Sequence, residues 1–311
     1  MGRLSLSAPK QRPLFGVLCA VGWSLAYPLI KLGYRLCGIG GDLGSAVLFA
    51  GIRFTLAGLL VLAFGGATGR DLRVKKASDG GWLLLFAAVN TFGHYLFAYI
   101  GLTYLPGARS TVLDSMGCFL LILLSSLLYK EDRFTVRKGI GCAVGLLGIG
   151  LINAAPAGAF FEGISFAGDG CLLLNACCAT AGGILTRKLS QRIDMTAATG
   201  YGMLTGGLLL LAAAPIFGIR AKWTLSPAFF CILLALALIS AVCFEIYNLL
   251  LKHHPIGKVA VFNALIPVLG VVFSSLLLWE PFRPRYFLAG LCAAAGVYLV
   301  NRSGEKRWDR S

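Results

Sequence analysis

Long runs of apolar residues, separated by short polar segments, are the dominant pattern of this sequence. A helix needs about 20 mainly apolar residues to cross the hydrocarbon core of a bilayer, and each run comes close to that length. The pattern therefore predicts an all-α integral membrane protein with ten transmembrane helices. The predicted helices cover residues 14–33, 44–64, 81–104, 107–128, 137–154, 165–187, 197–217, 227–251, 257–278 and 285–301.

One stretch of the chain occurs twice. Pro106 and Glu131 in the first copy correspond to Pro255 and Glu280 in the second, both at an offset of 149 residues. The sequence Ser-Ser-Leu-Leu lies shortly before the glutamate in each copy. A repeat this long exceeds the period of a solenoid and indicates two homologous halves.

Each half contains five predicted helices, which is an odd number. The second half therefore enters the membrane in the opposite orientation to the first, as in the inverted repeats of many secondary transporters. Substrate sites in that architecture lie near the midplane of the bilayer, between the halves. The two five-helix repeats are expected to cover residues 13–154 and 165–302.

Composition strengthens the membrane interpretation. Hydrophobic residues make up 58% of the chain and charged residues 13%, about half the charged share of soluble domains. The net charge of +15 would suggest a nucleic-acid partner if the protein were soluble. Because the basic residues lie in short segments between the apolar runs, we expect the lipid bilayer as a partner and no nucleic acid.

The distribution of the 28 lysines and arginines predicts the orientation. Twenty of them fall on the side of the predicted membrane that holds both termini, and seven fall on the other side. Cytoplasmic loops of membrane proteins carry the excess of Lys and Arg. We therefore expect a multi-pass protein of the cell (cytoplasmic) membrane with both termini in the cytoplasm.

Short motifs recur in a fixed order along the predicted helices. Gly22-Trp23-Ser24 lies in the first helix and Arg53-Phe54 in the second. Glu131 and Glu280 each follow an apolar helix and precede a helix rich in small residues. Together with the duplication, these motifs resemble the EamA-type transporters of the drug/metabolite transporter superfamily, over residues 13–303.

The resemblance implies a ten-helix inverted repeat that moves small metabolites by alternating access around a central cavity. Amino acids are a common substrate class in that family and are usually exported. The alternatives are import or exchange of another solute, such as a purine, a sugar conjugate or a lipophilic cation, and passive facilitation. The fourth helix departs from the family pattern, with Cys118 at the position that corresponds to Pro267.

Catalytic and cofactor motifs are absent from the sequence. It contains no Gly-rich phosphate loop ending in Lys-Ser/Thr, no Gly-x-Ser-x-Gly turn and no Cys/His spacing typical of a metal site. An intramembrane enzyme would need a catalytic pair near the membrane surface, and none is evident. We therefore expect a small-molecule solute as the ligand, with no enzyme activity, cofactor or metal.

Ionisable residues within the predicted helices are the first candidates for a transport site. A charged side chain at mid-membrane costs at least about 2.5–3.5 kcal/mol, so it usually faces a cavity or a partner. Arg53, His94, Asp114 and Glu245 meet this description. Glu245 is the main candidate, as a carboxylate that binds an amine or carries a proton, and the alternative is a structural partner for Arg53 or His94. Asp114 is a candidate partner for Arg53 or for the ammonium group of a substrate.

Two polar clusters, on the third and eighth helices, occupy repeat-related positions and suggest two walls of one cavity. Separate hydrogen bonds that hold the bundle together are the alternative. An aromatic wall just before Pro28 would suit an apolar or aromatic substrate. The predicted substrate-binding residues are Trp23, Ser24, Tyr27, Asn90, His94, Tyr95, Tyr99, Asp114, Asn175, Glu245, Asn248 and Asn263.

Two further features have alternative interpretations. Glu131 and Glu280 lie at helix ends beside basic residues. They form salt bridges that fix the helix ends in one interpretation, and they are gate residues that pair in one conformation in the other. Glycines at close spacing in the fifth and tenth helices favour close helix packing within one chain, and a homodimer interface is the alternative.

Overall fold

The computed structural model describes residues 11–39, 41–104, 107–153, 166–220, 223, 226–279 and 285–302. All regular secondary structure in these residues is helical, which confirms the predicted all-α class. Within the same residues, seven helices are long and apolar enough to cross a membrane. Gly117–Leu128, which is part of a longer helix, is a shorter apolar segment.

Most predicted runs form single helices whose ends lie within a few residues of the expected ones. These helices are α1 (Arg12–Cys37), α2 (Leu43–Ala67), α5 (Gly107–Leu128), α6 (Val136–Asn153), α7 (Phe166–Leu189), α8 (Met195–Ala213), α9 (Pro227–His253) and α12 (Arg285–Arg302). Side chains before several first turns explain where the helices begin. Asp42, Asp194 and Ser226 accept hydrogen bonds from backbone N–H groups at the starts of α2, α8 and α9.

Two predicted helices are interrupted by irregular turns. The third run consists of α3 (Ala77–Phe86), the π-helical segment η1 (Ala87–Gly93) and α4 (His94–Tyr104). The ninth run consists of α10 (Ile256–Ala260), the 3-10 segment η4 (Val261–Leu265) and α11 (Ile266–Leu278). Two short 3-10 turns, η2 (Lys130–Asp132) and η3 (Ala214–Phe217), lie in connections. Irregular turns inside apolar helices often mark functional positions.

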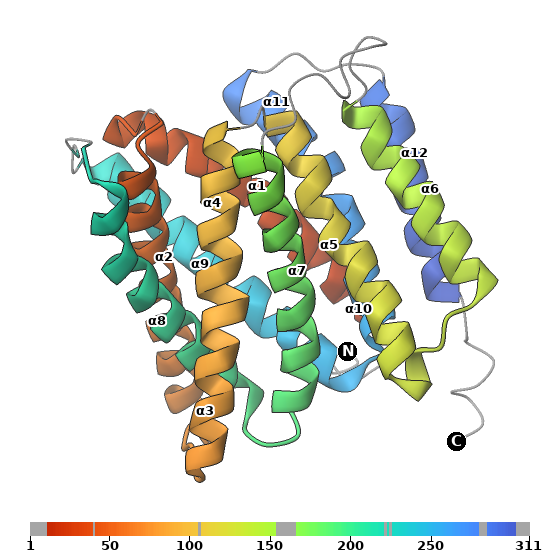
Figure 1. Ribbon diagram of the computed structural model, residues 1–311, viewed down its shortest axis with the longest axis horizontal. Coiled ribbons are helices and arrows are strands. Elements are labelled where there is room, and N and C mark those ends of the chain that lie inside the picture. Colours follow the sequence, from red (N-terminus) through yellow and green to blue (C-terminus); the bar gives the residue numbers. More distant parts are fainter. Residues whose placement is uncertain are drawn as a thin grey trace, which may run out of the picture.

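The helices form a bundle with α2 and α8 paired at one edge and α6 and α12 paired at the other (Figure 1). Between these edges, α7 packs against α4 and α5, while α1 packs against α9 and α11. In Figure 1, the connections α2–α3, α5–α6, α7–α8 and α9–α10 lie at the lower end of the bundle. The ends of α7 and α9 and the starts of α3 and α8 therefore meet at one face.

Glycine allows α2 and α8 to approach within backbone contact. A Cβ atom at Gly207 would lie 2.5 Å from the backbone nitrogen of Thr55 and 2.9 Å from the backbone carbon of Phe54. At Gly58, a Cβ atom would lie 2.8 Å from the carbonyl oxygen of Gly200. These contacts involve backbone atoms, so no side-chain rotation relieves them.

We expect Gly207→Ala to destabilise the protein by about 1–3 kcal/mol, because the added methyl group forces α2 and α8 apart. Gly66→Ala is the matched control, since a Cβ atom at Gly66 would meet nothing within 4 Å. Thermal unfolding of the purified protein in detergent measures both changes. An unchanged Tm for Gly207→Ala would show that the two helices are not in backbone contact.

The glycines of α6 and α12 face each other within the chain. A Cβ atom at Gly296 would lie 2.8 Å from the carbonyl oxygen of Gly141, and one at Gly141 would lie 3.0 Å from that of Gly296. This geometry agrees with the interpretation that these small residues serve packing within one chain. The homodimer stays a prediction.

Candidate functional site

Several predicted residues meet where α1, α9 and η4 come together. The ring of Trp23 packs edge-on against Tyr247, with centroids 5.1 Å apart. Asn263 Nδ2 donates a hydrogen bond to the Tyr247 hydroxyl at 3.1 Å. The Ser24 hydroxyl donates to the carbonyl of Ala20 in its own helix and also lies 3.1 Å from the carbonyl oxygen of Ile266. We call Trp23, Ser24, Phe244, Tyr247 and Asn263 the α1–α9 site.

Two prolines each remove one helical hydrogen bond at the α1–α9 site. Pro28 lies inside α1 and has no N–H to donate to the carbonyl of Ser24, one turn earlier. Pro267 lies in the first turn of α11 and cannot donate to Asn263, whose carbonyl instead accepts from Ile266 in the tighter 3-10 turn. Both interruptions therefore lie beside predicted substrate-binding residues.

A chain of aromatic rings extends the α1–α9 site to α4. Phe244 packs against Trp23 at a centroid distance of 5.2 Å and against Tyr95 at 6.3 Å. Tyr95 in turn contacts Phe54 at 4.0 Å and His94 at 4.5 Å. The structure thus links Trp23 to His94 and Tyr95 through Phe244. The predicted cavity between the polar clusters of the third and eighth helices stays a prediction. Phe244, which links them, was not predicted, because an aromatic residue in an apolar run has no distinguishing pattern.

The indole N–H of Trp23 is an unusual feature of the site. Its Nε1 atom is buried and has no hydrogen-bond partner among the described residues. A buried donor without an acceptor costs about 1–3 kcal/mol, and water is scarce inside a bilayer. The α1–α9 site therefore presents a donor that an acceptor group of a bound solute would satisfy.

Arg53 and Tyr99 lie beside the aromatic chain. Arg53 is 2% exposed, its Nε donates to the Ser240 hydroxyl at 2.9 Å, and its guanidinium lies 5.0 Å from the centre of the Phe54 ring. The ring of Tyr99 lies 6.3 Å from that of Tyr34. Arg53 is therefore held between α2 and α9 by contacts that do not involve Glu245.

Two predicted amide side chains lie at α7, one packed against this helix and one within it. Asn90, in η1, packs over Gly182, where a Cβ atom would lie 3.0 Å from the Asn90 Cβ. Asn175 is fully buried within α7. Thr180, five residues further along, donates to its own helix and lies 3.2 Å from the carbonyl oxygen of Gly117 in α5. This part of the predicted wall is closely packed.

Glu245 and Asn248 contact α7 and α8 rather than α1. Glu245 Oε1 accepts a hydrogen bond from the Thr196 hydroxyl of α8 at 2.5 Å. Asn248 Nδ2 donates to the Thr199 hydroxyl at 3.0 Å, and its Oδ1 lies 3.4 Å from the Thr186 hydroxyl of α7. We call these five residues the threonine cluster. The contacts place the two predicted polar residues of α9 on a different face from the one that meets α1.

Several predicted residues cannot be placed in either group. Tyr27 lies in α1, Asp114 in α5 and Glu131 in η2, but their side chains are outside the described part of the structure. Glu280 lies outside the described residues altogether. Their substrate-binding and gating roles stay predictions.

A buried ion pair beside Glu131 was missed from the sequence. Asp132 Oδ1 lies 2.5 Å from Lys138 Nζ, and the two side chains are 1% and 3% exposed. Asp132 Oδ2 accepts hydrogen bonds from the Ser125 hydroxyl at 2.7 Å and from the backbone N–H of Gly257 at 2.6 Å. Asp132 therefore links η2 and α6 to the start of α10. The only sequence signal was an acid beside a predicted helix end.

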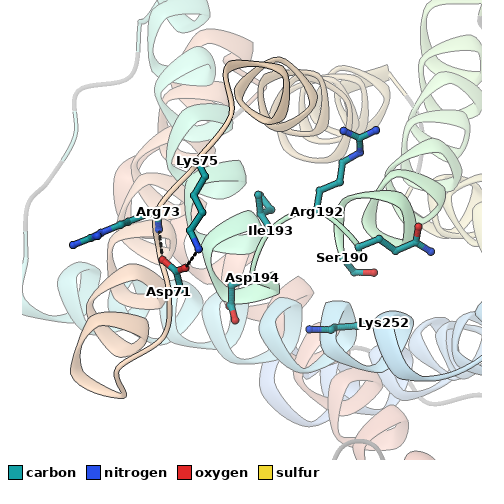
Figure 2. A pocket seen from close by; sticks show the side chains of 9 residues that line it. Asp71, Arg73, Lys75, Ser190, Arg192, Ile193, Asp194 and Lys252 are labelled. Atoms are coloured by element: carbon teal, nitrogen blue, oxygen red, sulfur yellow. Dashed lines mark hydrogen bonds and ion pairs between the residues drawn. The ribbon is translucent and has the colours of Figure 1, made fainter.

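A polar pocket of about 340 Å³ opens at the face where α7 ends and α8 begins (Figure 2). Asp71 accepts hydrogen bonds from Lys75, which lowers the pKa of the Asp71 carboxyl, and from the Arg73 backbone N–H. The pocket is lined by Asp71, Arg73, Lys75, Ser190, Gln191, Arg192, Ile193, Asp194 and Lys252. We call it the loop pocket. No group of three or more His, Cys, Asp or Glu residues able to hold a metal occurs among the residues described.

Long apolar helices, two of them interrupted by irregular turns, are features that this chain shares with secondary transporters. The sequence matches the model of the EamA-like transporter family at residues 13–154 and 166–302. The chain belongs to this family, and the resemblance noted in its motifs is confirmed.

The names of similar proteins agree with this family assignment. The chain is 27% identical to an uncharacterized transporter of Bacillus subtilis, YvbV, over 94% of this chain and 92% of the relative. It is 29% identical to an uncharacterized transporter of Synechocystis, over 90% and 89% of the two chains. A Salmonella typhimurium protein named "Probable amino-acid metabolite efflux pump" is 23% identical, over 91% and 92%. These names describe transporters rather than enzymes.

A solved structure has the same fold. A protein crystal structure superimposes with a TM-score of 0.75 at 18% identity, covering 92% of this chain and 96% of the other. The helical arrangement is therefore one that exists in a crystallised protein.

Proposed function

We propose that the protein is a secondary-active transporter that exports amino acids or related small metabolites by alternating access. The solute binds in a central cavity between two inverted five-helix halves, residues 13–154 and 165–302. The protein resides in the cell membrane, with both termini in the cytoplasm. The coarser statement, a membrane transporter of the EamA-like family, is already established by the family match.

The observation that carries the proposal is the unpaired indole N–H of Trp23 at the α1–α9 site. A solute carboxylate would accept this hydrogen bond. The surrounding rings of Phe244 and Tyr247 present apolar faces, which also attract ammonium groups by cation–π interaction. An amino acid with an apolar side chain carries a carboxylate, an ammonium group and an apolar group, which match these three kinds of contact.

The pattern of helix neighbours supports the inverted layout. Exchanging the two halves maps α1 onto α7, α4 onto α9, and α5 onto the α10–α11 run. The neighbours α1 and α9 then map onto α7 and α4, and the neighbours α1 and α11 map onto α7 and α5. Both resulting pairs are also neighbours, while α2–α8 and α6–α12 each map onto themselves. A bundle without internal symmetry would not require these matches.

The name of the Salmonella relative supports the substrate class, since an amino-acid metabolite is what that protein is said to export. Nothing in the α1–α9 site favours a purine, a sugar conjugate or a lipophilic cation over an amino acid. Its hydrogen-bonded polar groups, the Ser24 hydroxyl, the Tyr247 hydroxyl and the Asn263 amide, are uncharged. A small number of such uncharged polar groups is enough to orient a small zwitterion.

A thermal-shift screen tests the substrate class. Purified protein in detergent is heated with apolar, polar and charged amino acids, purines, sugar phosphates and lipophilic cations. A ligand that binds only the folded protein raises its Tm. We expect apolar amino acids to raise it most. Stabilisation by a purine or a sugar phosphate alone would contradict the proposed substrate class.

A further inference from the structure

Glu245 is a buried acid that forms no ion pair with the residues that the structure describes. Its side chain is 9% exposed, and Oε1 accepts the hydrogen bond from Thr196. Its second oxygen, Oε2, is buried and has no hydrogen-bond partner among the residues that the structure describes. An ionised carboxylate in this position would leave a charged oxygen unpaired in a low-dielectric environment, at high cost. A bound proton removes that charge.

The charged groups around Glu245 are few. Asp194, at the start of α8, and Arg70, after the end of α2, are the ionisable groups that act on it electrostatically. Arg70 lies 3.9 Å from Asp194, so the pair contributes little net charge. From α7 and α8, Glu245 and its neighbour Asn248 are faced by the threonine hydroxyls of the cluster. Because Arg70 is paired with Asp194, the described residues leave the Glu245 charge without a cation of its own.

The loop pocket is connected to Glu245 by hydrogen bonds through Thr196. Asp194 lines the pocket and accepts a hydrogen bond from the backbone N–H of Thr196 at 2.8 Å, while the hydroxyl of Thr196 contacts Glu245. Lys252, which also lines the pocket, lies seven residues after Glu245 and thus about two turns further along the same face of α9. Asp194, at the pocket (Figure 2), is therefore joined to the buried acid by two hydrogen bonds of Thr196.

From this geometry we infer that Glu245 is the proton-binding site that couples transport to a pH gradient, loaded from the loop pocket and separate from the α1–α9 solute site. In the loading step, hydronium in the pocket gives one proton to the carboxylate, which leaves a neutral carboxylic acid and water. The inference rests on the proposed transport function and adds the coupling ion to it.

The shared helix α9 provides the link between proton and solute. Phe244 and Tyr247 contact Trp23 on one face of α9, and Glu245 contacts α8 on another. Loss of the proton creates a buried charge between α8 and α9, which favours a rearrangement that hydrates Glu245. Any such movement of α9 also moves the aromatic wall of the solute site.

Proton binding is testable without a known solute. Infrared difference spectra of the full-length protein in liposomes, between acidic and alkaline buffer, are compared for the wild type and Glu245→Gln. We expect one buried carboxylic-acid band in the wild type that is lost in Glu245→Gln and is retained in Asp169→Asn, an acid in the first turn of α7. Thr196→Val retains the acid and is expected to shift the band. A difference spectrum unchanged by Glu245→Gln would overturn the inference.

Transport measurements separate this inference from the proposed function. Radiolabelled leucine serves as the probe, in counterflow without a pH gradient and in gradient-driven accumulation. We expect Glu245→Gln to retain counterflow and to lose all pH-gradient-driven accumulation. Wild-type counterflow without any effect of a pH gradient would refute proton coupling alone. The absence of counterflow with leucine and with every solute that stabilises the protein would refute the transport function itself.

Discussion

Asp132→Ala is expected to destabilise the folded protein by about 3–5 kcal/mol, because it leaves the Lys138 ammonium buried without its partner. The two side chains are almost completely buried, and Asp132 also accepts hydrogen bonds from Ser125 and from the backbone of Gly257. The substitution therefore removes contacts among η2, α5, α6 and the start of α10. Thermal unfolding in detergent measures the loss.

A surface ion pair provides the control for Asp132. Asp71 lies 2.7 Å from Lys75, but the side chains are 52% and 70% exposed. Exposed pairs contribute about 0–1 kcal/mol, so Asp71→Ala should leave the Tm nearly unchanged. The double variant Asp132→Ala/Lys138→Ala should cost less than the two single changes added together, because it leaves no unpaired charge. Equal losses for Asp132→Ala and Asp71→Ala would show that the buried pair is not formed.

Trp23→Phe is expected to weaken solute binding by about tenfold or more, while the protein still folds. The substitution retains an aromatic ring against Phe244 and Tyr247 but removes the only N–H that the indole offers. A hydrogen bond to a charged acceptor contributes about 1.5–3 kcal/mol, and 1.4 kcal/mol corresponds to tenfold in affinity. The half-saturating solute concentration in counterflow measures the change.

Trp82→Phe is the matched control for Trp23. Trp82 lies in α3, where Lys188 packs over its ring at 3.7 Å. It does not contribute to the α1–α9 site, so its replacement should leave the half-saturating concentration unchanged. Equal effects of the two substitutions would mean that the indole N–H of Trp23 does not bind the solute.

The hydrophobic pattern predicted the helices well because bilayer thickness fixes how long an apolar run must be. It did not predict the π-helical turn at Ala87–Gly93 or the 3-10 turn at Val261–Leu265. The first contains no proline, and only packing against neighbouring helices distinguishes it from a regular turn. Pro267 was visible in the sequence beside the second turn. Its effect on the hydrogen bonding of Asn263 required the structure.

The candidate site was predicted in part. Trp23, Ser24 and Asn263 were expected to line one cavity, and the structure brings all three to the junction of α1, α9 and η4. Helical periodicity separates Phe244 from Glu245 by 100° around α9. It does not specify which face meets α1 and which meets α8. That assignment depends on helix packing, and it places Glu245 beside Thr196.

Asp132 shows a different limit of sequence-based reasoning. It lies next to Glu131, which the repeat singled out because a glutamate recurs at the same place in the second half. Pro281 stands at the position of the second half that corresponds to Asp132. The repeat therefore did not identify Asp132 as a candidate. The buried ion pair belongs to one half only, and a comparison of the halves could not find it.

Solute counterflow in proteoliposomes tests the central claim, that the chain is a carrier with one solute site at the α1–α9 junction. Liposomes with purified protein are loaded with a solute that raised the Tm, and uptake of the labelled solute is followed over a range of outside concentrations. We predict transient accumulation that saturates in the wild type and needs about tenfold more solute in Trp23→Phe. Uptake that rises linearly without accumulation, or is identical in Trp23→Phe, would contradict the account.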